Sequence, residues 1–261
     1  MDTSTLLTAL FEKSRVLSSD SEPVLKIPFP SPDFKGFQGG CSDGKRYYYQ
    51  VLMHYELSDR SKDYSCIARV DLKTGEVTHS GVLSLGHAND VTYLREKHLL
   101  VIAENSPNPR RVYFVDPDTL TVVGSEEICD PIYALEYNEL RRRYLVGLSG
   151  TREFRFLDEE FRPTEDFTHR TVPSDDRCVK QGICADDTYL YFILWDGRHK
   201  TEPDFQNRIS VYDWSGAYCG TVNFDVGPNE PESLSIVNGE ILAVVVHDHS
   251  PMIYRITPKL P

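Results

Sequence analysis

The chain has 261 residues, of which 40% are hydrophobic and 11% aromatic, so it can fill a sizeable core and is not disordered. Its formal net charge of −12 argues against a nucleic-acid partner, because binding a phosphate backbone requires a concentrated basic surface. No apolar stretch reaches the roughly 20 residues of a membrane-spanning helix, so no membrane contact is expected.

The N-terminal segment predicts a short amphipathic helix within residues 4–16. Four apolar residues recur there at helical spacing: Leu6, Leu7, Leu10 and Phe11. A polar run follows, so residues 1–22 are interpreted as this helix and a linker, and residues 23–261 as one domain.

The predicted location is the cytoplasm. The first residues lack the basic segment and long apolar run of a secretory signal. The six cysteines show neither a C-x-x-C motif nor zinc-type spacing, which favours reduced thiols packed in a core.

One strand–turn–strand motif recurs five times after residue 30. Its copies begin at Gln38, Asn89, Tyr133, Gln181 and Glu232, so the steps between them are 51, 44, 48 and 51 residues. A repeat of this length, with two apolar strands and a third that ends in an acidic turn, is typical of a propeller blade. We therefore predict an all-β, five-bladed β-propeller, with blades near residues 35–80, 81–126, 127–170, 171–223 and 224–257.

The last blade lacks a fourth strand, because its repeat stops near Pro258. An apolar segment of strand length, residues 24–28, lies upstream of the first blade. We expect this segment to pair with the last blade, which would close the ring and cover an exposed sheet edge.

The five residues that open the repeats predict a polar ring at one mouth of the central channel, because the first strand of a propeller blade lines that channel. A buried polar group costs free energy unless it is hydrogen-bonded, so the ring should face a ligand or water. We assign substrate binding to Gln38, Asn89, Tyr133 and Gln181. A lining that holds only ordered water is the alternative.

Three residues near this ring suit proton transfer: His87, Asp90 and Glu232. A histidine titrates near neutral pH, and Asp90 is placed to orient His87 or a substrate amine. Glu232 is the one carboxylate of the ring, and partial dehydration would raise its pKa into a range useful for acid–base catalysis. Asp90 and Glu232 fall on non-adjacent blades, a spacing compatible with a hydrolytic carboxylate pair. Structural roles for His87 and Asp90 are the alternative.

Glycines and cysteines near the ring have two interpretations each. Gly39, Gly40 and Gly182 either let a ligand approach the backbone or relieve crowding at the narrow axis. Cys41 and Cys184 hold equivalent repeat positions, so packing between blades explains them better than nucleophilic catalysis does.

The ends of the second strands carry polar residues in three blades: Glu104-Asn105, Trp195-Asp196 and His247-Asp248-His249. We interpret them as solvent-facing turns at the mouth opposite the ring. Two histidines on one loop leave a metal site incomplete, so no metal ligands are assigned.

The segments Phe37-Gln38-Gly39-Gly40, Asn89–Tyr93 and Gln181-Gly182-Ile183 resemble the five-bladed plant-type glutaminyl-peptide cyclotransferases. In that family, F-T-Q-G and G-E-G-L-T motifs point into an axial pocket, which implies such a pocket around Gln38. Asn89 stands where that family has its catalytic Glu. The chain is also similar to bacterial propellers of unassigned activity with Q-G-x-C-x-D-G and G-H-A-N-D-x-T-Y motifs, here Gln38–Gly44 and Gly86–Tyr93.

The favoured function is an enzyme with an axial pocket that uses acid–base chemistry on a polar or amine-bearing small molecule or peptide terminus, of cyclotransferase, lyase or hydrolase type. The alternatives are a non-catalytic propeller that binds a sugar, amino acid or peptide, and a protein-interaction scaffold. No cofactor is predicted, although the channel leaves room for a divalent cation. The sequence carries no signal for the oligomeric state.

Overall fold

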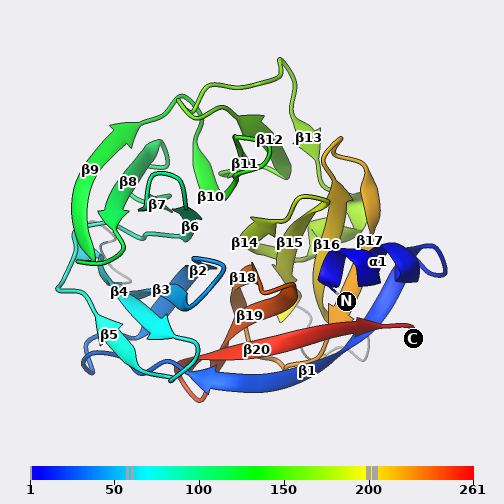
Figure 1. The fold of residues 1–261 in the computed structure, drawn as a ribbon, viewed down its shortest axis with the longest axis horizontal. Helices are drawn as coiled ribbons and strands as arrows, with labels where there is room; N and C mark the ends of the chain where they lie inside the picture. The colour runs from blue at the N-terminus through cyan, green and yellow to red at the C-terminus, as the bar shows by residue number, and fades with distance from the viewer. Residues whose placement is uncertain (1, 57–58, 60–61, 198–200, 202–204) are drawn as a thin grey trace.

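The strands of this chain form five four-stranded blades around a central axis, as the computed structural model shows for residues 2–56, 59, 62–197, 201 and 205–261 (Figure 1). Three blades are separate sheets, and the other two are joined into one sheet of eight strands. This arrangement confirms the predicted fold class.

Each of the first three blades is an antiparallel meander that runs from the axis outward (Figure 1). Blade 1 consists of β2 (Gly36–Ser42), β3 (Tyr47–His54), β4 (Tyr64–Asp71) and β5 (Val77–His79). Blade 2 consists of β6 (Asp90–Leu94), β7 (Leu99–Ala103), β8 (Arg111–Asp116) and β9 (Thr121–Glu127). Blade 3 consists of β10 (Ile132–Asn138), β11 (Arg143–Leu148), β12 (Glu153–Leu157) and β13 (His169–Arg170).

Blades 4 and 5 share the N-terminal strand. Blade 4 consists of β14 (Val179–Ala185), β15 (Tyr189–Trp195), β16 (Asn207–Asp213) and β17 (Tyr218–Phe224), and a 3-10 helix (Pro173–Arg177) precedes it. Blade 5 consists of β18 (Pro231–Val237), β19 (Glu240–His247) and β20 (Ser250–Lys259), with β1 (Val16–Lys26) as its fourth strand.

Strand β1 closes the ring. It pairs antiparallel with β20 from Ser18, opposite Lys259, to Lys26, opposite Met252, as predicted for an N-terminal strand. Its first two residues also pair in parallel with β17, which links blades 4 and 5. The strand begins at Val16, so the predicted strand at residues 24–28 was too short and the linker within residues 1–22 was partly wrong. Most side chains of β1 are at least partly exposed, so no apolar alternation marked this outer strand.

The third-to-fourth strand turns use aspartate side chains as the sequence indicated. Asp71 Oδ1 accepts hydrogen bonds from the backbone N–H groups of Lys73 and Thr74, at 2.9 and 3.3 Å. Asp116 Oδ1 accepts from the N–H of Thr119 at 2.8 Å. Such side-chain bonds fix a tight turn, which keeps the outer strands of each blade in register.

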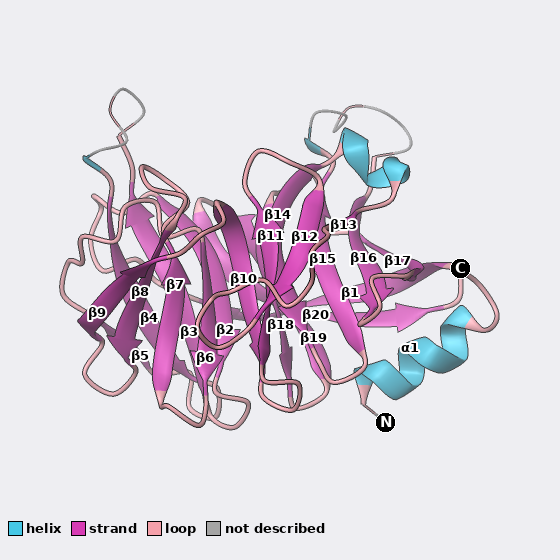
Figure 2. Cartoon of the chain, turned by 90° about the horizontal axis from the view of Figure 1, so that it is seen from above, coloured by secondary structure: helices cyan, strands magenta, loops and turns pink. Residues whose placement is uncertain are grey.

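The predicted helix is present as α1 (Thr3–Phe11), shorter than the expected limit of residue 16. The Asp2 carboxylate caps its N-terminus by accepting a hydrogen bond from Thr5 N–H. Leu7 is fully buried in the core shared by blades 4 and 5, and Thr8 Oγ1 lies 2.8 Å from the Tyr189 hydroxyl. The helix therefore packs outside the ring beside β1 and β20 (Figures 1 and 2).

Apolar side chains fill the spaces between neighbouring blades. Cys41 packs with Tyr49 and Val91 between blades 1 and 2, and Cys184 belongs to the core between blades 4 and 5. Burial raises the pKa of both thiols well above its usual value. Packing between blades is therefore confirmed for both cysteines. Among the described residues, no helix is long and apolar enough to cross a membrane.

Candidate functional site

The inner strands of the blades begin at one mouth of the channel, which we call the front mouth. The second strand of each blade ends at the same mouth, because it pairs antiparallel with the first: Val179 lies opposite Trp195, and Pro231 opposite Val245. The prediction that the polar ends of the second strands lie at the opposite mouth was therefore wrong. The ends of the second strands therefore lie at the front mouth, beside the predicted ring residues.

A cavity of about 530 Å³ opens at the front mouth. Five of the seven predicted site residues line it: Gln38, His87, Asn89, Gln181 and Glu232. Asp90 and Tyr133 do not. The cavity wall also includes four polar residues that the sequence interpretation did not assign to it: Lys35, Tyr55, Glu230 and His249.

Local irregularities of the inner strands orient the ring residues. The ladder register shifts between Phe37 and Gly40 in β2, between Lys180 and Ile183 in β14, and between Pro231 and Ser233 in β18. Such β-bulges redirect side chains and are frequent next to active sites. The ring positions Gln38, Gln181 and Glu232 all fall inside these bulges.

Glu230 and Glu232 form a pair of interacting carboxyl groups in the cavity wall. Burial raises the pKa of Glu230 and raises that of Glu232 strongly, and the charge of Glu230 raises the pKa of Glu232 further. Gln181 Nε2 donates a 2.6 Å hydrogen bond to Glu230 Oε1, which favours the ionised form of Glu230. Two adjacent carboxyl groups in a dehydrated site tend to hold one proton between them, which Glu232 keeps here.

The two amides beside this pair differ in their freedom. Asn89 Nδ2 donates to the Tyr133 carbonyl oxygen at 2.8 Å, and Asn89 Oδ1 accepts from Asn105 at 3.2 Å, so its amide is fixed between blades 2 and 3. The side-chain amide of Gln38 makes no hydrogen bond within the described part of the chain. Gln38 is therefore the amide that can turn toward a ligand.

His87 lies at the cavity wall with a carboxylate partner other than the predicted Asp90. Its Nδ1 is 3.5 Å from Oδ2 of the buried Asp63, which precedes β4. The His87 backbone N–H donates to the Ser106 carbonyl oxygen at 2.7 Å, which fixes the loop before β6. Asp63 lies outside the repeated motif, so no pattern in the sequence pointed to it.

Asp90 is buried at the axis rather than exposed in the cavity. Its carboxylate accepts hydrogen bonds from the backbone N–H groups of Val91, Leu135 and Ile183, at 3.0, 3.2 and 3.5 Å, so it links blades 2, 3 and 4. Burial raises its pKa well above the usual value. The geometry gives Asp90 a structural role, and Glu230, not Asp90, is the carboxyl group next to Glu232.

Tyr133 also lies outside the cavity. Its ring packs so closely on Gly147 that a Cβ atom there would come within 2.4 Å of it, and Lys180 Nζ lies 4.1 Å from the ring centroid. The side chain belongs to the apolar core between blades 3 and 4, although its strand has the same kind of register shift, at Ile132–Ala134, as the other inner strands. The prediction that Tyr133 contacts the axial ligand is not supported by this position.

The glycines of the ring relieve crowding at the axis. A Cβ atom on Gly39 would lie 2.3 Å from Asp90 Cα, and one on Gly182 would lie 3.0 Å from Ser233 Cα. Both neighbours are backbone atoms of the inner strand of the next blade, β6 for Gly39 and β18 for Gly182. The structure therefore favours close strand packing over ligand approach as the reason for these glycines.

Glu230 and His249 were missed for different reasons. Glu230 lies two residues before Glu232 and just before β18, outside the repeated motif, so the repeat positions did not point to it. His249 lies in the turn between β19 and β20, at the end of the second strand of blade 5, and this turn is at the front mouth.

Among the described residues, no group of three or more His, Cys, Asp or Glu side chains is arranged to hold a metal ion.

No protein-family model and no curated protein matches this sequence. Glutaminyl cyclase of Myxococcus xanthus has a similar structure, with a TM-score of 0.62 at 8% identity over 94% of this chain and 98% of that chain. The tail fibre of Staphylococcus aureus phage P68 matches with a TM-score of 0.61 and 10% sequence identity, over 92% of this chain and 53% of that chain. Regucalcin, a calcium-binding protein of Agrobacterium tumefaciens, matches with a TM-score of 0.52 and 10% sequence identity, over 95% of this chain and 98% of that chain. At these identities the likeness shows the propeller fold alone.

Proposed function

We propose that the axial cavity binds a small polar molecule or peptide terminus that carries an amine, and that Glu232 transfers a proton to or from it. The observation that carries this proposal is the pair of carboxyl groups, Glu230 and Glu232, in the wall of a polar cavity. The hydrogen bond from Gln181 to Glu230 separates their roles, because it stabilises a negative charge on Glu230 and leaves the proton on Glu232.

Each residue has a role in this scheme. Ionised Glu230 attracts the ammonium group of the ligand, and the Gln38 amide orients a carbonyl or hydroxyl oxygen. Protonated Glu232 acts as a general acid, and after proton transfer the same carboxylate acts as a base. Cyclotransferase, lyase and hydrolase chemistry all need such a group. The resemblance around Phe37–Gly40 makes peptides with N-terminal glutamine the first substrates to test.

Non-catalytic binding of the same ligand class is the second candidate. Several polar groups of the wall are already engaged before any ligand binds, Asn89 and Gln181 among them. A preorganised wall of this kind favours selective binding as much as catalysis.

Turnover and binding measured on the same variants separate the two functions. Wild-type protein, Glu232→Gln and Glu230→Gln would be incubated with N-terminal glutamine peptides, amino-acid amides and amino sugars, and the products identified by mass spectrometry. Glu76→Gln, on an exposed turn of blade 1, is the matched control. We expect Glu232→Gln to lose about 100-fold or more in turnover while ligand affinity changes only a few-fold. Equal turnover in Glu232→Gln and Glu76→Gln would refute a catalytic role for Glu232.

A further inference from the structure

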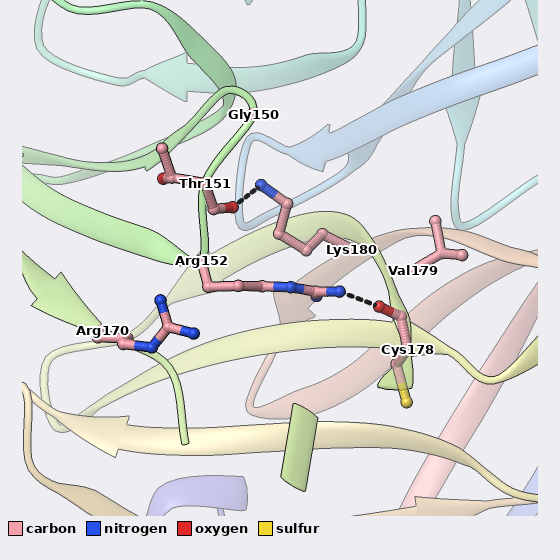
Figure 3. A pocket seen from close by; sticks show the side chains of 7 residues that line it. All are labelled: Gly150, Thr151, Arg152, Arg170, Cys178, Val179 and Lys180. Carbon is pink, nitrogen blue, oxygen red and sulfur yellow. Dashed lines mark hydrogen bonds between the residues drawn. The ribbon is translucent and has the colours of Figure 1, made fainter. Parts of the chain in front are cut away.

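A second cavity of about 540 Å³ lies between blades 3 and 4 and is rich in cationic side chains. It is formed by the turn after β11, by Arg170 of β13 and by the residues that open β14 (Figure 3). Three of its seven lining residues are cationic: Arg152, Arg170 and Lys180. This concentration of positive charge stands out in a chain with a net charge of −12.

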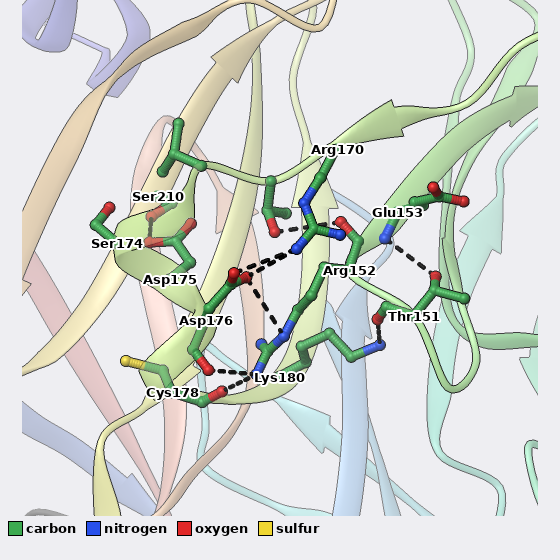
Figure 4. A network of polar contacts seen from close by, with 12 residues as sticks. Thr151, Arg152, Glu153, Arg170, Ser174, Asp175, Asp176, Cys178, Lys180 and Ser210 are labelled. Carbon is green, nitrogen blue, oxygen red and sulfur yellow. Dashed lines mark hydrogen bonds and ion pairs between the residues drawn. The ribbon is translucent and has the colours of Figure 1, made fainter.

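The positive charges of this cleft are only partly neutralised. Asp176 is the one carboxylate that pairs with any of the three within the described part of the chain. It lies 3.2 Å from Arg170 Nη2 and 3.8 Å from Arg152 Nε (Figure 4). Lys180 has no carboxylate partner among the described residues. The cleft therefore keeps an excess of positive charge.

Lys180 is held at the cleft by neutral groups. Its Nζ donates to the carbonyl oxygen of Thr151 (Figure 3). It also donates to the carbonyl oxygen of Leu148, at 3.1 Å, and lies over the Tyr133 ring. Carbonyl oxygens and an aromatic face orient an ammonium group without cancelling its charge. Burial and the charge of Arg152 lower the pKa of Lys180 to about 8, as expected for a cation that lacks an anionic partner.

The Arg152 guanidinium has one nitrogen, Nη1, without a hydrogen-bond acceptor among the described residues. Its Nη2 donates to the carbonyl oxygens of Asp176 and Cys178, at 3.0 and 2.7 Å, whereas the buried Nη1 has no acceptor among the described residues. A buried donor without an acceptor costs free energy, so a ligand oxygen at this position would stabilise the site. An arginine with a free donor beside a lysine is suited to bind an oxyanion.

The framework around the three cations is fixed. Ser210 donates a hydrogen bond to the buried Asp175 at 2.9 Å (Figure 4), and Tyr212 donates a second one at 3.2 Å. These bonds anchor the 3-10 helix that carries Asp176. Arg152 is tied to the residues after this helix through the Cys178 carbonyl oxygen. A ligand would thus meet cationic groups that are already in position.

We propose that the cleft between blades 3 and 4 is a binding site for a small oxyanion, a carboxylate or a tetrahedral anion such as sulfate or phosphate, held by Arg152, Arg170 and Lys180. The site is separate from the carboxyl pair of the axial cavity, although both cavities reach Val179. It does not depend on the proposed acid–base function.

Calorimetric titration with sulfate and with succinate tests this site, because the charge of both anions is constant around neutral and mildly alkaline pH. We expect millimolar or tighter binding of at least one anion, and the stronger binder distinguishes a tetrahedral from a carboxylate ligand. Lys180→Met and Arg170→Ala should each weaken binding about tenfold. Arg162→Ala, an exposed arginine of the same blade, and Glu232→Gln should leave it unchanged.

The pH dependence gives a second, independent readout. Binding to the wild-type protein should weaken as the pH rises through about 8, where Lys180 loses its proton, and Lys180→Arg should bind equally well on both sides of that pH. Among the described residues, the other charged or titratable groups at the cleft are Arg152, Arg170, Asp176, Cys178 and Tyr133, and they stay unchanged in that variant. Absence of binding to the wild-type protein, or equal binding by Lys180→Met, Arg170→Ala and Arg162→Ala, would overturn the proposal.

Discussion

Replacing Gly39 with alanine should destabilise the propeller at its axis. The added Cβ atom would lie 2.3 Å from Asp90 Cα and 2.7 Å from Val91 N, whereas ordinary van der Waals contact begins at 3.4 Å. The backbones of blades 1 and 2 must therefore move apart by about 1 Å, and the hydrogen bond from Gly39 N–H to the Asn89 carbonyl oxygen, now 3.0 Å, must lengthen. The cost should reach the upper part of the range for overpacking, about 3 kcal/mol.

Thermal and denaturant unfolding measure this cost directly. For a domain of this size, about 3 kcal/mol corresponds to a fall in Tm of roughly 6 to 12 °C. Gly124→Ala is the matched control, because a Cβ atom on this glycine of the outer strand β9 would lie 3.5 Å from Phe114 Cδ2, an ordinary contact. Equal stability of the two variants would refute the close packing of the inner strands around Asp90.

Two further predictions concern protonation and thiol reactivity. The folded protein holds the Glu232 proton at a pH where the unfolded chain has lost it, so this group stabilises the fold most at acidic pH, and its contribution falls as the pH rises above about 4.3. The free energy of unfolding of Glu232→Gln minus that of the wild type should therefore increase from pH 4 to pH 8 in denaturant titrations, and a constant difference would contradict the raised pKa. Alkylation followed by mass spectrometry should modify the exposed Cys129 much faster than the buried Cys41, and similar rates would contradict the packing of Cys41 between blades.

The blade plan was predictable because it depends on local patterns. Apolar strands, acidic turns and the spacing of the repeats are all properties of short segments, and they identified the inner strand of every blade. The N-terminal strand was only partly predictable, since the polar residues around Ser18 pair through their backbones on the outer edge of the ring and carry no apolar alternation.

The site was predictable only where the repeat fixes the direction of a side chain. Gln38, Gln181 and Glu232 line the cavity, as their repeat positions indicated. Tyr133 holds the same repeat position, but its aromatic ring packs against Gly147 and beneath Lys180 instead. Asp90 receives hydrogen bonds from three different blades, and such long-range contacts leave no pattern in a single sequence.

Ligand-induced thermal stabilisation tests the central claim most directly, because a ligand that binds only the folded protein raises its apparent stability. Pairs of ligands that differ only in an amine or a hydroxyl group at the same position would be compared on wild-type protein, Gln38→Ala and Glu230→Gln. The axial site predicts that an amine-bearing ligand raises the Tm of the wild type more than its hydroxyl partner does, that Glu230→Gln reduces this difference, and that Gln38→Ala reduces the shift with both ligands. Equal shifts for the two partners, or shifts unchanged in both variants, would contradict a functional site at the axis.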